Sequence, residues 1–260
     1  MRVAGVGRAV FAAVMVWLGL LGLIGGDFAP IWEPSPKNLP AREVIVYLSA
    51  AISLAAGAGL VFQRTAATAA RVLLVYLLLW LVLFRGLAIV RAPISQDSWS
   101  GFGETAVIVA GAWVLYAASA DSWNSRLGFA TGKRGSRIAR MLYGFALIPF
   151  GVAHFHFAKE TASLVPSWLP AHLIWAYFTG AAYLAASAAV LSGVLGRLAA
   201  TLSAIQIGLL TVLVWFPIMA AGVKDASAWS ETVISVTLTA AAWVVAESYR
   251  GAPWLATGRR

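Results

Sequence analysis

The sequence contains no cysteine and little charge. The lack of cysteine excludes disulfides, thiolate catalysis, iron–sulfur clusters and cysteine-type zinc sites. Only 11% of the residues are charged and 61% are hydrophobic, whereas an average soluble domain has about 25% charged residues. A soluble chain of this composition would expose large apolar patches. The composition therefore predicts an integral membrane protein in contact with the lipid bilayer.

Acidic residues are the scarcer charge, with 10 Asp and Glu against 19 Lys and Arg and a net charge of +9. The basic residues fall between apolar runs rather than on one soluble segment, so we expect no nucleic-acid binding. The sequence also lacks a phosphate-binding loop, a dinucleotide fingerprint, an HExxH zinc motif and a Ser/His/Asp pattern. It therefore identifies no catalytic residue.

Long apolar runs are what the chain has instead. A membrane-spanning helix needs about 20 mostly apolar residues, whereas transmembrane strands have about ten residues and alternate in polarity. The fold class is thus predicted to be all-α, a polytopic membrane protein with eight transmembrane helices. The predicted spans cover residues 8–26, 42–62, 70–91, 104–120, 138–156, 171–193, 198–220 and 230–248.

An internal repeat relates the two halves of the sequence at one constant offset, the separation of Leu39 from Leu169, which we call the repeat offset. Four helices in each half would bring both halves into the membrane from the same side, which is a parallel pseudo-repeat of two four-helix bundles. We expect a first half at 1–125, a basic cytoplasmic linker at 126–137 and a second half at 138–260. The matching pairs are Leu39/Leu169, Pro40/Pro170, Ala41/Ala171, Tyr47/Tyr177, Trp99/Trp229 and Trp113/Trp243.

The Leu-Pro-Ala step of this repeat precedes the second and sixth spans. Pro40 and Pro170 suit the first turn of a helix, where a missing N–H has no cost. Trp32 and Trp168 precede them and fit an aromatic belt at the membrane surface. A ligand-contacting lip is the alternative interpretation of this motif.

The distribution of Lys and Arg predicts the orientation. Thirteen of the 19 lie on the side that carries both termini, and six lie on the other side. Cytoplasmic loops carry the excess of Lys and Arg in membrane proteins, so both termini should be cytoplasmic.

Arg85 lies inside the third predicted span, in LLLWLVLFRGLAIVRA. An ionisable group within a span is costly and by default indicates function, but a guanidinium this near the outer end could also extend to the surface. In the functional interpretation it pairs with Asp27, Asp97 or Glu104, or binds an anionic ligand.

Other polar residues near the outer side invite both structural and functional interpretations. His154 and His156 are two positions apart and do not share a helix face, so we assign no metal ligand; surface hydrogen bonding and contact with a quinone both remain open. Tyr177 is either structural or a ligand contact. Glu104 and Glu231 are expected to open the fourth and eighth spans, with Ser230 as a cap, where carboxylates favour the positive end of the helix dipole.

The run GVAHFHFAKETASLVPSWLPAHLIWAYFTGAAYLAASAAVL at 151–191 resembles the DoxX-like family of small bacterial membrane proteins. The resemblance implies a four-helix unit, here fused in tandem, in the bacterial cytoplasmic (inner) membrane. It also implies a membrane subunit that supports a redox process beside partner enzyme subunits, with a quinone held near the outer face. The residues we assign to that ligand site are Arg85, His154, His156, Trp168 and Tyr177.

Two other functions remain open from the sequence. A non-catalytic membrane scaffold for a partner enzyme would need no cofactor, and a homo-oligomer is compatible with either role. A small-molecule transporter would fit the parallel repeat, but matched breaks in corresponding helices are then expected. Pro217 in the seventh span has no matching proline in the third.

Overall fold

The computed structural model describes residues 5–32, 35, 37–119, 128–222 and 225–257. Within these ranges the chain is entirely helical, without strands, and eight helices are long and apolar enough to cross a membrane. The predicted fold class is confirmed to this extent. The uninterrupted spans are α1 (Gly5–Gly25), α2 (Arg42–Val61), α5 (Gln96–Ser119), α6 (Gly132–His156), α8 (His172–Ser192) and α11 (Ala226–Glu247).

The third and seventh spans each contain a short π-helical stretch. The third consists of α3 (Gln63–Trp80), the π segment η2 (Leu81–Gly86) and α4 (Leu87–Arg91). The seventh consists of α9 (Gly196–Leu210), the π segment η4 (Thr211–Trp215) and α10 (Phe216–Ala220). The first residues of the two π segments are separated by the repeat offset. Two short helices, η1 (Pro30–Trp32) and α7 (Ala158–Ser163), lie in the connections.

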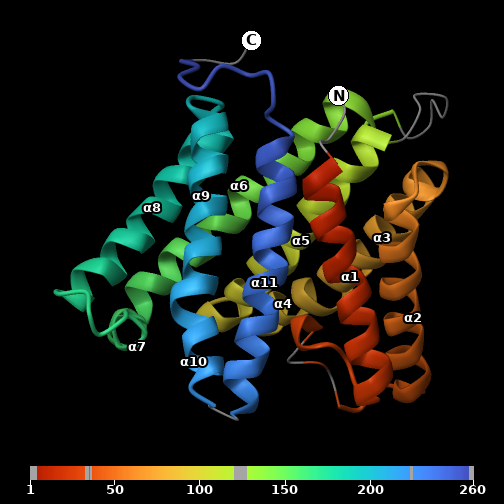
Figure 1. Ribbon diagram of the computed structural model, residues 1–260, viewed down its shortest axis with the longest axis horizontal. Helices are drawn as coiled ribbons and strands as arrows, with labels where there is room; N and C mark the ends of the chain where they lie inside the picture. The colour runs from red at the N-terminus through yellow and green to blue at the C-terminus, as the bar shows by residue number, and fades with distance from the viewer. Residues whose placement is uncertain (1–4, 33–34, 36, 120–127, 223–224, 258–260) are drawn as a thin grey trace.

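The helices pack in the same order in both halves (Figure 1). In the first, α1 packs on α2, α2 on α3 and α3 on α5; in the second, α6 packs on α8, α8 on α9 and α9 on α11. The halves meet where α5 packs on α11, with α6 against α5 and α1 against α11. At this crossing a Cβ atom on Gly111 would lie 3.1 Å from the Cα atom of Ala241. The missing side chain therefore allows the two central helices to approach closely.

Several helix boundaries follow the repeat offset. α2 and α8 begin at Arg42 and His172, and both are preceded by an alanine in the left-handed conformation, Ala41 and Ala171. α5 and α11 begin at residues 96 and 226. These agreements support the offset, whereas the division into two bundles related by a pseudo-two-fold axis stays a prediction.

The prolines of the repeated step are not in the first turn of their helices, so that prediction was wrong. Ala41 and Ala171 are the N-cap residues, which puts Pro40 and Pro170 one position before each cap. A left-handed alanine costs roughly 1–2 kcal/mol, and the chain uses it twice to turn from the surface into the membrane. The last part of the predicted linker, 132–137, belongs to α6, and residues 126 and 127 lie outside the described ranges.

The beginning of α1 and the segment that follows α11 lie at the same end of the bundle (Figure 1). An even number of spans requires this arrangement. Which end faces the cytoplasm stays a prediction from the distribution of Lys and Arg.

Candidate functional site

Arg85 lies in the π segment η2 and is only 6% exposed. Its Nε donates to Oγ1 of Thr105 (3.2 Å), and its Nη2 donates to the carbonyl oxygen of Ile31 (3.2 Å). The guanidinium is therefore held inside the protein, and the alternative in which it extends to the surface is wrong. A buried polar side chain persists in an apolar interior when such partners satisfy it.

One face of α5 is shaped to receive this guanidinium. A Cβ atom at Gly101 would lie 3.0 Å from Nη1 of Arg85, so a larger residue there would displace the charge. Thr105, one turn further along, accepts from Arg85 and donates to the carbonyl oxygen of Gly101 (3.1 Å). Glycine makes the space and threonine supplies the acceptor on the same helical face.

Two carboxylates extend this site to the contact between the halves. Glu104 on α5 interacts electrostatically with Arg85 and with Glu231 on α11. We call Arg85, Glu104 and Glu231 the central polar cluster. Of the acids expected to pair with Arg85, Glu104 is the one with which the structure gives an interaction, whereas Asp27 pairs with Arg42 at 2.5 Å.

The position of these carboxylates corrects the sequence interpretation. α5 begins at Gln96, so Glu104 lies well inside the helix rather than at its start. α11 is capped by Asp225, whose carboxylate accepts from the Ser227 backbone N–H (3.2 Å), so Ser230 is not the cap. The sequence interpretation took the polar residues before the apolar runs of α5 and α11 for loops. For α11, the Asp one residue before the helix start is the signal that could have placed the boundary.

Aromatic rings pack beside the cluster in the first half. Trp80, just before η2, stacks on Trp32 (ring centroids 4.7 Å apart) and contacts Phe84 (4.3 Å). Trp32 is 2% exposed, so its predicted place in a surface belt was wrong. These rings exclude water from one side of Arg85's segment, and low polarity strengthens the electrostatic interactions nearby.

The two histidines do not converge on one point. α6 continues through His156, and at about 100° per residue the two side chains are about 200° apart around it. The Nδ1 of His154 pairs with the carbonyl oxygen of Phe150 (2.8 Å) and its ring lies 5.3 Å from that of Tyr183, whereas His156 is exposed. Among the described residues no group of three His, Asp or Glu is placed to hold a metal.

Tyr177 and Trp168 lie near the same end of the second half. The Tyr177 ring stacks on Phe155 (5.7 Å) and is 43% exposed, and Trp168 is 69% exposed. The contacts of His154 and Tyr177 thus join α6 to α8, whereas the contacts given above for Arg85 join η2 to α5 and η1. The contacts of the predicted ligand residues therefore do not bring Arg85 together with His154 and Tyr177.

Comparisons with models of protein families, with curated proteins and with solved structures found no match. The resemblance to the DoxX-like family therefore stays a prediction.

Proposed function

We propose that the protein is a proton-coupled transporter of a small solute, with the central polar cluster as its coupling site. The observation that carries this proposal is the burial of Arg85 beside the Glu104–Glu231 pair, where helices of the two halves meet. Ionisable residues inside spans mark substrate pathways and proton relays in membrane proteins.

The charges of the cluster favour a proton as the coupling ion. Glu104 and Glu231 carry like charges and repel each other when both are ionised, so a proton bound by one of them removes that repulsion. Neutrality is the stable condition in an apolar interior, and like charges repel most strongly there. Glu104 interacts with both other members and is therefore the residue through which gain or loss of the proton would act on Arg85.

The matched π segments add a second line of support. Transporter folds use helices interrupted at corresponding positions of two repeats, and the starts of η2 and η4, Leu81 and Thr211, are separated by the repeat offset. π turns are frequent at functional sites. Pro217 lies two residues after η4 and has no N–H to bond a carbonyl oxygen of the preceding turn, whereas η2 forms without a proline.

The first test measures proton movement in vesicles. The purified protein is reconstituted into liposomes that contain a pH-sensitive dye, and a panel of small organic acids, sugars and amines is added outside. We expect at least one solute class to cause a pH change inside, and Glu104→Gln to abolish it. Glu43→Gln is the matched control, because Glu43 is an exposed residue on α2.

The outcome that would contradict the transporter is specific. If Glu104→Gln and Glu43→Gln support equal solute-driven pH changes, the cluster is not the coupling site. If no solute on the panel moves protons and the purified protein instead carries a quinone, the second candidate below is favoured.

The second candidate is a membrane subunit that supports a redox process of a quinone, as the DoxX-like resemblance implies. The observation in its favour is the environment of His154. A carbonyl oxygen only accepts, so the pairing with Phe150 requires Nδ1 of His154 to donate, and Nε2 of the neutral ring is left as an acceptor. Such a nitrogen could take a proton from a quinol hydroxyl near the outer end of α6.

Extraction of the purified protein with organic solvent and mass spectrometry of the extract tests the quinone. We expect a bound quinone whose amount falls in His154→Ala and not in His156→Ala, because His156 is exposed. In this role the protein would act with redox-enzyme subunits, and co-purification from native membranes would identify them. A scaffold without cofactor would co-purify with partners but yield no quinone.

We also propose the bacterial inner membrane as the location, with both termini in the cytoplasm. The absence of cysteine makes the test direct, because each introduced cysteine is the only thiol in the chain. Ile94 is 97% exposed and follows the third span, whereas Phe129 is 47% exposed and precedes α6. In intact spheroplasts a membrane-impermeant thiol reagent should label Ile94→Cys and not Phe129→Cys; the reverse result would invert the orientation.

A further inference from the structure

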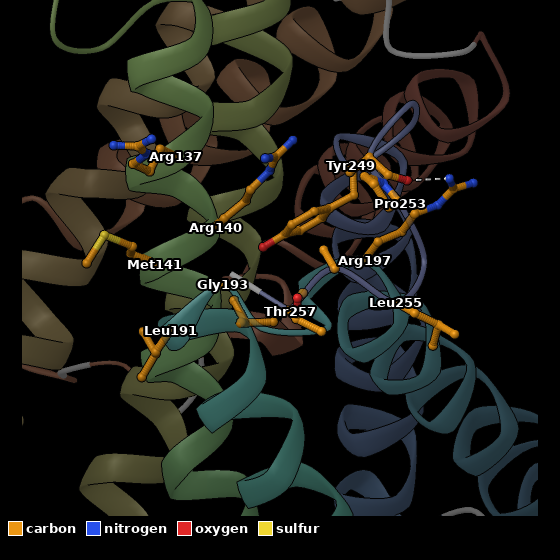
Figure 2. Close-up of a pocket in the computed structure, with 14 residues that line it drawn as sticks. Arg137, Arg140, Met141, Leu191, Gly193, Arg197, Tyr249, Pro253, Leu255 and Thr257 are labelled. Carbon is orange, nitrogen blue, oxygen red and sulfur yellow. Dashed lines mark hydrogen bonds between the residues drawn. The ribbon is translucent and has the colours of Figure 1, made fainter. Parts of the chain in front are cut away.

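A cavity of about 500 Å³ lies at the end of the bundle where α6 and α9 begin and the segment after α11 folds back. Figure 2 shows Arg137, Arg140 and Met141 of α6 on one side and Arg197, Tyr249 and Leu255 on the other. This volume lies within the range of small-ligand sites. The cavity is distant in the fold from the central polar cluster. It lies at the end of the bundle where α9 begins, whereas Arg85 lies in η2, in the later part of the third span, towards the other end.

The lining is strongly cationic. Its 14 residues include three arginines and no Asp or Glu. Arg137 and Arg140 are one helical turn apart and interact unfavourably with each other. The ion pairs given among the described residues, Arg42–Asp27 and Arg250–Glu247, involve other arginines.

Neutral groups hold two of these arginines in place. Arg140 donates from Nε to Oγ of Ser248 (2.9 Å) and from Nη2 to its carbonyl oxygen, and its guanidinium lies 3.9 Å from the centre of the Tyr249 ring. Arg197 donates to the carbonyl oxygen of Ala252 (2.7 Å) and lies 3.9 Å from the Trp254 ring. These contacts order the charges without neutralising them. An anion in the cavity would therefore meet arginines that are already oriented.

Tyr249 adds a hydrogen-bond donor to the lining. Its hydroxyl faces α6 (Figure 2), and the ring is 8% exposed. Burial raises the pKa of Tyr249 above its ordinary value, although Arg140 acts in the opposite direction. The hydroxyl is therefore protonated at neutral pH and can donate to an anionic oxygen.

One residue of the lining, Met141, is also the first residue of an apolar strip on α6. Met141 belongs to the lining, and Phe145, Ile148 and Val152 follow it at helical spacing with 54%, 37% and 41% exposure. Residues at this spacing lie on one face of a helix. The combination of an arginine-lined cavity and an apolar strip leading into the membrane matches a molecule with an anionic head and a hydrocarbon tail.

We propose that this cavity binds the phosphate group of an anionic phospholipid. Basic pockets between spans at the cytoplasmic side are suited to lipid head groups, and each Lys or Arg near an anionic membrane surface adds about five-fold to binding. The phosphate lies against Arg137, Arg197 and the Tyr249 hydroxyl, and the acyl chains follow the strip from Met141. A soluble phosphate compound offers the same head chemistry without the chains.

Native mass spectrometry of the full chain in detergent micelles tests the proposal, with phosphatidylglycerol, phosphatidylcholine and inorganic phosphate as probes. We expect the wild type to retain phosphatidylglycerol, and Arg137→Gln with Arg197→Gln to weaken its binding by about 25-fold. Arg134→Gln is the matched control, because Arg134 is exposed on the same helix and does not line the cavity. The control should bind within about two-fold of the wild type.

Three results decide between the outcomes. Equal retention of phosphatidylcholine and phosphatidylglycerol would overturn the selection of an anionic lipid, because both carry a phosphate, and equal loss in the control and in the double variant would overturn the arginine site. Displacement of the lipid by inorganic phosphate at equal concentration would support the phosphate site and assign it to a soluble compound. Arg137→Gln alone is also measured, because its exposed side chain can change without unfolding the segment that Arg197 holds.

Discussion

The two π segments stand at corresponding positions of the third and seventh spans but contain different chemistry. In the first half, Arg85 of η2 donates to Thr105 of α5. In the second half, Thr211 of η4 shares a hydrogen bond with Ser235 of α11 (2.6 Å), and position 215, which corresponds to Arg85, is a tryptophan. Thr105 and Ser235 are themselves related by the repeat offset. The irregular backbone and the facing hydroxyl are thus common to both halves, and the buried charge is confined to one.

This difference shows which features belong to the architecture and which to a site. A feature that occurs at both positions, such as the π turn, belongs to the repeated architecture, and it supports transport only as a pair of matched interruptions. The guanidinium occurs only once, and it faces a glycine, Gly101, where the second half has Glu231. The asymmetry therefore builds one polar centre from a cation of the first half and carboxylates of both halves.

Removal of the buried cation Arg85 should have the largest effect. Arg85→Met removes two hydrogen bonds from a charged donor, each worth about 1.5–3 kcal/mol, and takes away the charge that interacts with Glu104. Trp215→Met at the corresponding position should cost less. Unfolding in detergent measures both, and adding Glu104→Gln to Arg85→Met should restore part of the loss. An additive double variant would show that the two residues do not interact.

The crossing of the central helices should be the next most sensitive place. Gly111 and Ala241 are related by the repeat offset and contact each other, so the halves meet here through corresponding positions. Gly111→Val forces α5 from α11 and should cost about 3 kcal/mol, at the upper end for overpacking. Ala241→Val should cost a similar amount if the crossing is symmetric; a large difference in unfolding free energy would argue against symmetry.

Gly101→Ala should have a smaller and more local effect. Its Cβ would lie 3.0 Å from Nη1 of Arg85, which has to move, and the expected cost is about 1 kcal/mol. Solute-driven proton movement should fall more than stability does. Gly208→Ala is the control in the second half, where the nearest atom would be 3.4 Å away. Equal solute-driven proton movement in Gly101→Ala and Gly208→Ala would show that the position of Arg85 does not affect transport.

The smallest expected effects concern the hydrogen bonds between the second and third helices of each half. Tyr76 pairs with Ser49 in the first half, and Gln206 donates to the Thr179 carbonyl oxygen (3.0 Å) at the corresponding place in the second. Tyr76→Phe and Gln206→Leu should each cost about 0.6 kcal/mol, the average for such bonds in membranes. Unfolding in detergent measures both costs. A cost several times larger for one variant would show that this side chain does more than link two helices.

Hydropathy predicted the spans because every one of them is an apolar run long enough for the membrane. It failed at the start of α5, where four of the first five residues, Gln96, Asp97, Ser98 and Ser100, are polar and yet helical, since membrane thickness does not limit how far a helix extends into the surface layer. Arg85 was recognised from its isolation in an apolar run. Glu104 and Glu231 were misplaced because their role depends on which helices pack together, and that information is absent from any single span.

Backbone irregularity was also beyond the sequence interpretation. Proline and glycine are the residues that signal a break, but Pro217 lies just beyond η4 and has no matching proline near η2, which contains only Gly86 at its end. The left-handed alanines at 41 and 171 were hidden for a similar reason, since alanine carries no preference for that conformation. In both cases the repeat was the stronger signal, because the same irregularity recurs at the corresponding position of the second half.

A π turn holds one residue more than the regular helix would within nearly the same rotation, because bonding from i to i+5 replaces bonding from i to i+4. Deletion of a single residue from 81–84 would therefore let the helix close regularly and leave the residues beyond it facing nearly the same way. Arg85 would still point towards Thr105. The third span can thus lose one codon at this place without turning the buried cation away from α5.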